Sequence, residues 1–276
     1  MSSRGAPFVK MSGSGNDFIF FDVRGADPTP FADPSRIRAL CARGVGVGAD
    51  GVVLLESSAR APYAMRYFNA DGSLASLCGN ATLCAARLGA ELGIIEPAQA
   101  MAGFRFGTGV GEIEARLVDG VPEIGLATPA GLQVDLASQL GLAAGERRIG
   151  FVEIGVPHIV ILVESADRAA LDSRGPELRR HAAFPHGANV NFVSREGGGW
   201  RYRTYERGVE NETLACGTGA AACALLLREW GEESSTAHFR TSSGSDLTVS
   251  LGTGVDLPPR LRGSARIVYR GELAEI

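Results

Sequence analysis

The sequence predicts an α+β fold of two pseudo-symmetric lobes, each a mostly antiparallel sheet wrapped around a central helix. Two observations predict this fold. The halves of the chain repeat one order of segments at an offset that drifts from 142 to 135 residues. Each half also places one long apolar helix pattern among short alternating strands. A tandem duplication explains both, with residues 1–128 as the N-terminal lobe and 129–264 as the C-terminal lobe.

The repeat begins with a strand and a short helix in each half. A Gly-led turn and an apolar strand occupy residues 13–22, and the same pattern returns at 155–164. Asp33-Pro34 then has the residues of a helix N-cap and first helical position, and Pro176 is predicted to open the matching helix.

The long helices come next. Residues 78–92 and 216–230 are apolar over most of their length, and each stretch ends at a glycine, Gly93 or Gly231. Helices of this composition are usually buried. Each is therefore predicted to be the central helix of its lobe.

Strands close each half. Phe104 and Phe239 are each predicted to start a strand. Residues 112–117 alternate between polar and apolar side chains, and Asp119-Gly120 is a typical hairpin turn.

Composition excludes several classes of function. The 276-residue chain is 45% hydrophobic and 21% charged, as in globular proteins, and its formal net charge of −4 argues against nucleic acid or an anionic membrane as partner. No run reaches the length of a transmembrane helix, and residues 1–10 lack the apolar stretch of a signal peptide. We therefore expect a cytoplasmic protein.

The five cysteines fall into two groups. Cys78 and Cys216 each open one of the long helices, whereas Cys41, Cys84 and Cys223 lie within helix patterns and are predicted to be core residues. The odd number does not suit a disulfide framework, and no Cys-x-x-Cys pair indicates zinc, so we expect no metal site.

A cysteine at a helix N-terminus has a distinct chemistry. Unpaired backbone N–H groups there bind carboxylates and lower the pKa of a thiol. If the lobes face each other across a pseudo-twofold axis, Cys78 and Cys216 approach one ligand from opposite sides. This arrangement suits inversion of a carbon centre, in which one thiolate removes the α-proton and the other thiol protonates the opposite face.

Lysine usage argues against the usual cofactor of amino-acid racemisation, which forms a Schiff base with a lysine. Lys10 is the one lysine in the chain, and it stands at the entry to the first strand. We therefore expect a reaction without a cofactor.

These motifs together resemble the diaminopimelate epimerase family over nearly the whole chain. The matching stretches are residues 10–18, 68–73, 78–80, 155–158, 187–192, 206–208 and 212–219. The resemblance implies the two-lobed fold, return of the last strand (265–276) to the first lobe, and a homodimer. It also implies interconversion of LL- and meso-diaminopimelate in lysine biosynthesis, with Cys78 and Cys216 as base and acid.

The resemblance also implies the residues around the substrate. Those expected to contact it are Asn16, Asn69, Gly79, Asn80, Asn189, Glu206, Arg207, Gly217 and Thr218, and His158 is expected to support the site. Glu206 and Arg207 suit the distal end of the substrate, because a carboxylate pairs with an ammonium and a guanidinium with a carboxylate.

The sequence departs from many family members at four places, one of which is a Glu206–Cys216 spacing one residue longer than in many members. Gly51 and Val156 stand where many members have side-chain amides, and Ala81-Thr82-Leu83 replaces a Gly-x-Arg segment. Substrate identity therefore stays open at this point. One alternative is a racemase for another amino acid, such as histidine or a proline derivative. Another is a non-catalytic ligand-binding protein with structural cysteines.

Overall fold

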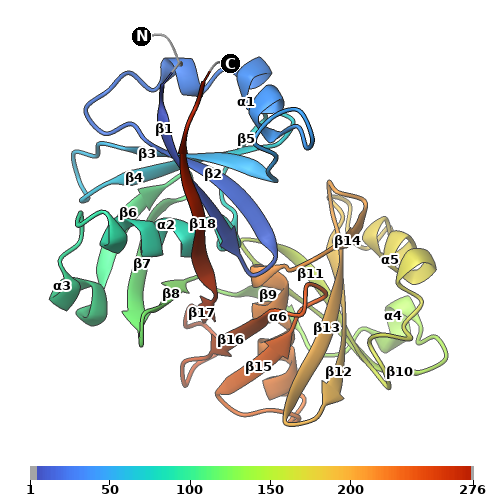
Figure 1. The fold of residues 1–276 in the computed structure, drawn as a ribbon. Coiled ribbons are helices and arrows are strands. Elements are labelled where there is room, and N and C mark those ends of the chain that lie inside the picture. Colours follow the sequence, from blue (N-terminus) through green and yellow to red (C-terminus); the bar gives the residue numbers. More distant parts are fainter. Residues whose placement is uncertain (1–4, 275–276) are drawn as a thin grey trace. The chain divides into compact units, whose positions relative to one another are not determined.

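The computed structural model describes residues 5–274, which form two compact units. The N-terminal lobe comprises residues 5–124 and 263–274, and the C-terminal lobe comprises Gly125–Arg262 (Figure 1). The chain thus returns to the N-terminal lobe for its last strand. The positions 1–4 and 275–276, which the sequence assigned to that lobe, lie outside the described residues.

The N-terminal lobe is built mainly of strands. They are β1 (Pro7–Gly13), β2 (Asn16–Asp22), β3 (Gly51–Glu56), β4 (Ala64–Asn69), β5 (Leu74–Ala75), β6 (Phe104–Thr108), β7 (Gly111–Val118), β8 (Val121–Gly125) and β18 (Ala265–Glu272). The helices are η1 (Thr29–Phe31), α1 (Pro34–Cys41), α2 (Gly79–Glu91) and α3 (Pro97–Ala102).

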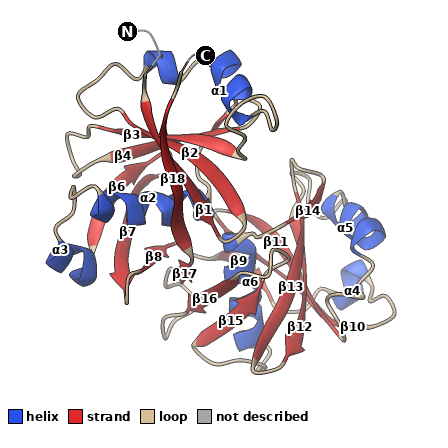
Figure 2. Ribbon diagram, viewed as in Figure 1, coloured by secondary structure: helices blue, strands red, loops and turns tan. Residues whose placement is uncertain are grey.

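The C-terminal lobe has a matching set. Its strands are β9 (Ala130–Gln133), β10 (Glu146–Ile154), β11 (Val156–Val163), β12 (Asn189–Glu196), β13 (Gly199–Glu206), β14 (Asn211–Thr213), β15 (Thr236–Arg240), β16 (Asp246–Ser250) and β17 (Arg260–Gly263). Its helices are α4 (Ala137–Leu140), α5 (Leu171–Arg179) and α6 (Gly217–Glu229) (Figure 2).

Strand pairing repeats between the lobes, element by element. In the first, β2 is antiparallel to β1 and parallel to β3, while β4 is antiparallel to β3 and β5 and parallel to β6. In the second, β11 is antiparallel to β10 and parallel to β12, while β13 is antiparallel to β12 and β14 and parallel to β15. The predicted α+β fold of two similar lobes is confirmed.

The helices α2 and α6 form the centre of their lobes. Helix α2 contacts β1, β2, β4, β7 and β18, and α6 contacts β10, β11, β12, β15 and β16. Burial on nearly every side explains why their sequences are apolar all round. Each helix ends as predicted, with a glycine in the left-handed region, Gly93 (φ 67°) or Gly231 (φ 74°).

A second apolar layer covers the other face of each sheet. Ile37 and Leu40 of α1 pack on Ile19 and Leu54 in the first lobe. In the second lobe, the side chains of α5 that pack on the sheet are Leu171 and Leu178. Each sheet therefore packs between a central helix and a short outer helix.

Two predicted boundaries were wrong. Helix α5 begins at Leu171, so Pro176 lies inside it and not at its start. Phe239 lies near the end of β15, which starts at Thr236, whereas β6 does start at Phe104. The hairpin at Asp119-Gly120 is confirmed, because both residues have positive φ (52° and 76°) between β7 and β8.

No helix within residues 5–274 has both the length and the apolar character needed to cross a membrane.

Candidate active site

Cys78 is the N-cap residue of α2. Its backbone is extended (φ −138°, ψ 117°), and its side chain does not cap the helix. The Thr82 hydroxyl donates to the Cys78 carbonyl oxygen at 2.8 Å, which fixes the cysteine on the first turn. The thiol is half-buried beside the backbone N–H groups of Gly79 and Asn80.

The structure brings Asn16 and Asn80 together beside this helix end. Asn80 Nδ2 donates to Asn16 Oδ1 at 2.7 Å, and Asn16 Nδ2 donates to Asp50 Oδ2 at 2.9 Å. Sequence reasoning missed Asp50. It is the next-to-last residue of the glycine-rich stretch 44–51, and its conformation there was not evident from the residues alone.

Asn69 lies at the end of β4, paired with Gly51 of β3. Its Nδ2 donates to Ser73 Oγ at 3.0 Å, so in this structure the side chain holds the turn that follows. Gly51 has no room for a side chain, because a Cβ would lie 2.4 Å from the Phe68 carbonyl oxygen and 2.5 Å from the Tyr67 ring. The Tyr67 ring and the Phe68 carbonyl thus occupy the space that a side chain at position 51 would need.

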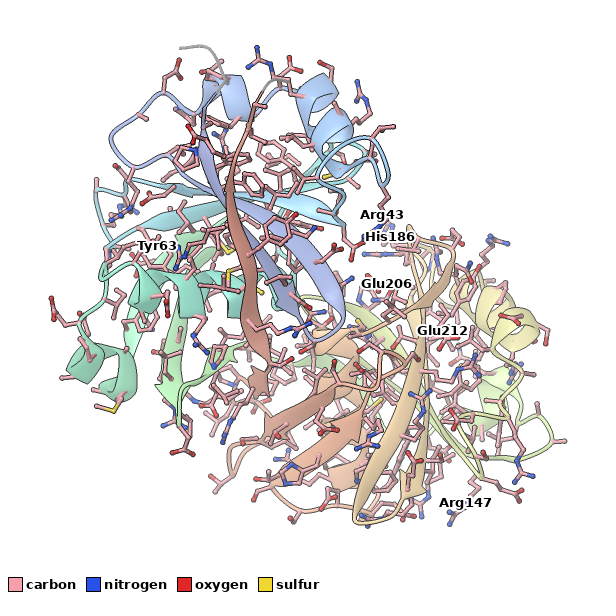
Figure 3. All side chains as sticks on the ribbon, in the orientation of Figure 1. Arg43, Tyr63, Arg147, His186, Glu206 and Glu212 are labelled. Atoms are coloured by element: carbon pink, nitrogen blue, oxygen red, sulfur yellow. The ribbon has the colours of Figure 1, made fainter. Side chains whose placement is uncertain are left out.

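Lys10 takes part in an ion-pair cluster. Its ammonium lies 2.7 Å from Asp17 Oδ2, and Arg43 pairs with Asp17 (2.6 Å) and Asp50 (2.8 Å). Figure 3 labels Arg43, which follows α1. Burial alone would raise the pKa of Asp17, but hydrogen bonds from Arg43 and Lys10 outweigh it and hold the pKa below its ordinary value.

Cys216 is the N-cap residue of α6, with nearly the same backbone as Cys78 (φ −127°, ψ 104°). The buried Tyr202 hydroxyl donates to the Cys216 carbonyl oxygen and accepts from the Cys216 N–H, both at 3.1 Å. The Cys216 Sγ lies 3.6 Å from Thr218 Oγ1. Tyr202 therefore fixes the backbone of Cys216. No local sequence pattern indicates this contact between β13 and the N-cap of α6.

Glu206 is the last residue of β13 and Arg207 follows it; Figure 3 labels Glu206. Glu206 Oε2 accepts from the Thr213 hydroxyl at 2.7 Å. Burial raises the pKa of the Glu206 carboxyl, and the Thr213 hydrogen bond offsets part of that effect. Asn189 Oδ1 accepts from the Arg207 N–H at 2.8 Å, and Arg207 Nη1 donates to the His186 carbonyl at 3.1 Å. The structure thus brings Asn189, Glu206 and Arg207 together.

His158 is fully buried on β11. Asn191 Nδ2 donates to the Ile159 carbonyl at 3.0 Å and lies 3.2 Å from His158 Nδ1, while Asn191 Oδ1 accepts from the Thr204 hydroxyl. Since Asn191 presents a donor, His158 Nδ1 is an acceptor and Nε2 carries the proton. Burial, helped by the charge of Arg207, lowers the pKa of His158 to about 3. The ring is therefore a neutral Nε2–H donor.

The remaining cysteines are all buried, as predicted for core residues. Burial raises the pKa of Cys41 to about 11 and also raises the pKa values of Cys84 and Cys223. These three thiols therefore stay protonated at neutral pH.

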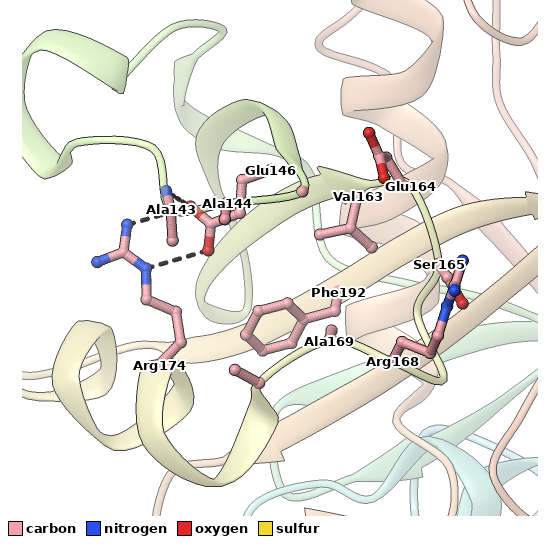
Figure 4. A pocket seen from close by; sticks show the side chains of 12 residues that line it. Ala143, Ala144, Glu146, Val163, Glu164, Ser165, Arg168, Ala169, Arg174 and Phe192 are labelled. Atoms are coloured by element: carbon pink, nitrogen blue, oxygen red, sulfur yellow. Dashed lines mark hydrogen bonds and ion pairs between the residues drawn. The ribbon is translucent and has the colours of Figure 1, made fainter.

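A cavity of about 390 Å³ in the C-terminal lobe lies away from these residues (Figure 4). The Arg174 guanidinium at its wall bonds Glu146, Glu177 and the Gly141 carbonyl, so its donors are already used. None of the site residues predicted from the sequence lines this cavity. Within residues 5–274, no group of three or more His, Cys, Asp or Glu side chains is placed to hold a metal ion.

Solved structures show which class of fold this is. A phenazine biosynthesis protein of the PhzF family from Bacillus anthracis matches with a TM-score of 0.73 over 98% of this chain and 99% of its own, at 16% identity. A hydroxyproline epimerase from Agrobacterium vitis matches with a TM-score of 0.65 over 98% and 91%, at 18% identity. The chain has the two-lobed fold of these proteins.

Sequence comparison defines the family within this class. The model of the diaminopimelate epimerase family matches residues 8–119 and 150–251, and the chain belongs to that family. A diaminopimelate epimerase from Gemmatimonas aurantiaca is 48% identical over 97% of this chain and 99% of its own length. Another from Methanocella arvoryzae is 36% identical over 96% of each. The resemblance predicted from the motifs is confirmed, and the chain is an enzyme of the isomerase class.

Proposed function

We propose that this chain interconverts LL- and meso-diaminopimelate without a cofactor, with Cys78 and Cys216 as its two proton-transfer groups. The observation that carries the proposal is the equivalence of the two cysteines. Each is the N-cap of a central helix, each has an extended backbone, and neither side chain is used to cap its helix. A buried cysteine used for packing alone has no reason to repeat this geometry.

The reaction needs one base and one acid on opposite faces of the α-carbon. One cysteine, as thiolate, takes the α-proton, and the C–H electron pair stays on the carbon as a carbanion. The other cysteine, as thiol, gives its proton to the opposite face. Backbone N–H groups at the helix N-termini, with Gly79 and Gly217 at the first helical positions, bind the substrate carboxylate and the charge that develops on it.

Substrate binding divides between the lobes in this proposal. Asn16, Asn69 and Asn80 belong to the N-terminal set, and Asn189 and Thr218 to the C-terminal set. His158 supports the site as a neutral Nε2–H donor.

The distal amino-acid end is assigned to Glu206 and Arg207. A partly buried glutamate with a raised pKa favours a cationic partner, since an ammonium would stabilise its ionised form. This supports a substrate with a second ammonium and carboxylate, and it does not suit proline.

Product analysis tests the proposal. The purified chain, reduced and without added cofactor, is incubated with LL-diaminopimelate, L-histidine, L-proline or trans-4-hydroxy-L-proline, and the stereoisomers are separated by chiral chromatography. We expect meso-diaminopimelate and no inversion of the other three. Inversion of a single-ended amino acid at a higher kcat/KM would assign a different racemase.

The family resemblance also supports a homodimer acting in lysine biosynthesis in the cytoplasm. Sedimentation equilibrium tests the assembly directly, with a mass twice the 28.9 kDa of one chain as the expected result. A single-chain mass at micromolar concentration would remove the homodimer from the proposal.

A further inference from the structure

The buried oxygen of Asn80 has no hydrogen-bond partner within residues 5–274. Asn80 is 3% exposed and lies on the first turn of α2, two residues after Cys78. Its other amide atom, Nδ2, is used, because it donates to Asn16 Oδ1 at 2.7 Å. A buried amide oxygen without a hydrogen-bond donor destabilises a fold. Neighbouring groups must therefore hold the Asn80 amide in this orientation.

Asp50 determines that orientation through Asn16. Its Oδ2 accepts from Asn16 Nδ2 at 2.9 Å and from the Asp17 N–H at 3.2 Å. An ionised carboxylate only accepts hydrogen bonds. Asn16 must therefore turn its NH₂ group toward Asp50 and its oxygen toward Asn80. Asn80 in turn directs its NH₂ group to Asn16, so its oxygen points away from Asn16.

The position of Asp50 is itself fixed by its backbone. The Asp50 N–H donates to the Asp17 carbonyl at 2.8 Å, and the Ala70 N–H donates to the Asp50 carbonyl at 3.1 Å. Arg43 adds a 2.8 Å contact to Oδ1, although its side chain is 63% exposed and contributes less than a buried partner would. The carboxylate therefore has one acceptor oxygen aimed at Asn16 and the other at Arg43.

We propose that Asp50 is a positioning residue that sets the direction of the Asn16–Asn80 amide pair, so that Asn80 Oδ1 is presented as an acceptor for the ammonium group of the substrate. This rests on the proposed function, in which the amino acid binds at the start of α2. The helix N-terminus supplies N–H donors for its carboxylate, and Asn80 adds the acceptor that its ammonium requires.

The test first removes the carboxylate at position 50 and then places one at position 80. Asp50→Ala removes the acceptor that holds the Asn16 NH₂ group, whereas an asparagine at position 50 would keep its oxygen toward Asn16 and the Asp17 N–H. Without that acceptor the direction of the amide pair is no longer set, and Asn80 is free to turn its NH₂ group toward the ammonium. We expect KM for diaminopimelate to rise at least ten-fold, with a smaller change in kcat. Adding Asn80→Asp restores an acceptor at position 80, and this double variant should recover most of the lost affinity.

Asp22→Ala is the matched control, because Asp22 is also an aspartate paired with an arginine, Arg24, but lies at the exposed end of β2. Its KM should equal that of the wild type. An unchanged KM in Asp50→Ala, or a double variant no better than the single one, would overturn the proposal.

Side-chain amide NMR separates this proposal from the proposed function. Asp50→Ala should shift the Asn16 and Asn80 NH₂ signals with no substrate present, while Asp22→Ala leaves them in place. If the wild type neither binds nor inverts diaminopimelate, the proposed function fails, yet these shifts still decide whether Asp50 directs the amides. Unshifted signals in a folded Asp50→Ala protein contradict the proposal that Asp50 sets the direction of the Asn16 and Asn80 amides.

Discussion

The five cysteines differ in what surrounds them. Cys84 and Cys223 lie within the central helices and Cys41 at the end of α1, and all three are packed among core side chains. Cys78 and Cys216 instead stand where backbone N–H groups are unpaired. Position on a helix, more than burial alone, separates a reactive thiol from a structural one.

Alkylation should follow this division. With iodoacetamide at pH 7, we expect Cys78 to be modified first, because it is the half-buried one and lies at a helix N-terminus. Cys216 should follow, and Cys41, Cys84 and Cys223 should stay unmodified while the protein is folded. Peptide mass spectrometry measures each rate, and a urea-denatured sample, in which all five react, is the reference. Earlier labelling of Cys84 or Cys223 in the folded protein contradicts the assignment.

The ionised Glu206 carboxylate should lower the free energy of unfolding at neutral pH. Its folded-state pKa is raised by burial, so folding is favoured when it is protonated, and that benefit is lost as pH rises through the folded pKa. Glu206→Gln should therefore melt at a higher temperature than the wild type at pH 7 and lose turnover. The difference in melting temperature should vanish below the ordinary glutamate pKa of 4.5.

Calorimetry across pH measures this effect, and Glu153→Gln, an exposed glutamate on β10, is the control that should change little. A Glu206→Gln variant that melts below the wild type at pH 7 would contradict the prediction that the ionised carboxylate destabilises the fold.

For single residues, the sequence predicted candidate site positions but not the contacts that these side chains make. The motifs predicted Asn16, Asn80, Glu206 and His158. The departure at Gly51 was visible too, but only the structure shows the Tyr67 ring filling that space. Contacts between side chains distant in sequence depend on register and rotamer, which local patterns do not report.

Helices and strands were predictable where a local signal decides their ends. α1 begins after Asp33, whose carboxylate accepts from the Ser35 and Arg36 N–H groups, as its N-cap pattern indicated. α5 was misjudged because its first turn, from Leu171, lacks an N-cap hydrogen bond, and Pro176 looked like a start signal. Burial of Leu171 and Leu178 against the sheet overrides that local signal.

Gly219 on the first turn of α6 should tolerate no side chain. A Cβ there would lie 2.4 Å from Asn191 Oδ1 and 3.2 Å from Cys216 Sγ. Gly219→Ala should destabilise the fold by about 1–3 kcal/mol, as overpacking in a core does. It should also lower turnover, because Cys216 has to move.

Urea denaturation and initial rates measure both effects. Gly198→Ala is the matched control, since a Cβ at that position meets nothing within 4 Å. A Gly219→Ala variant with the stability and rate of Gly198→Ala contradicts the packing that the structure shows around Cys216.

For the whole molecule, the duplication was the most informative signal in the sequence. The same order of parallel and antiparallel pairings recurs in both lobes, from β1–β2 in one to β10–β11 in the other. The order of segments predicted two similar lobes because a repeated order of apolar segments implies a repeated core. The order of segments alone could not predict that β18 returns beside β1, which depends on tertiary pairing; only the family resemblance implied this return.

The central claim is that two equivalent cysteines move the α-proton of diaminopimelate, and solvent exchange at that carbon tests it most directly. LL-diaminopimelate is incubated in deuterated water with the wild type, Cys78→Ala, Cys216→Ala or the core control Cys84→Ala, and NMR and mass spectrometry follow deuterium in each isomer. We predict a meso product carrying one deuterium at the inverted carbon from the wild type and from Cys84→Ala. Each of the first two variants should lose at least about a hundred-fold in rate. A folded, reduced wild type that exchanges no α-proton, or a Cys78→Ala or Cys216→Ala protein that keeps the wild-type rate, would contradict the account.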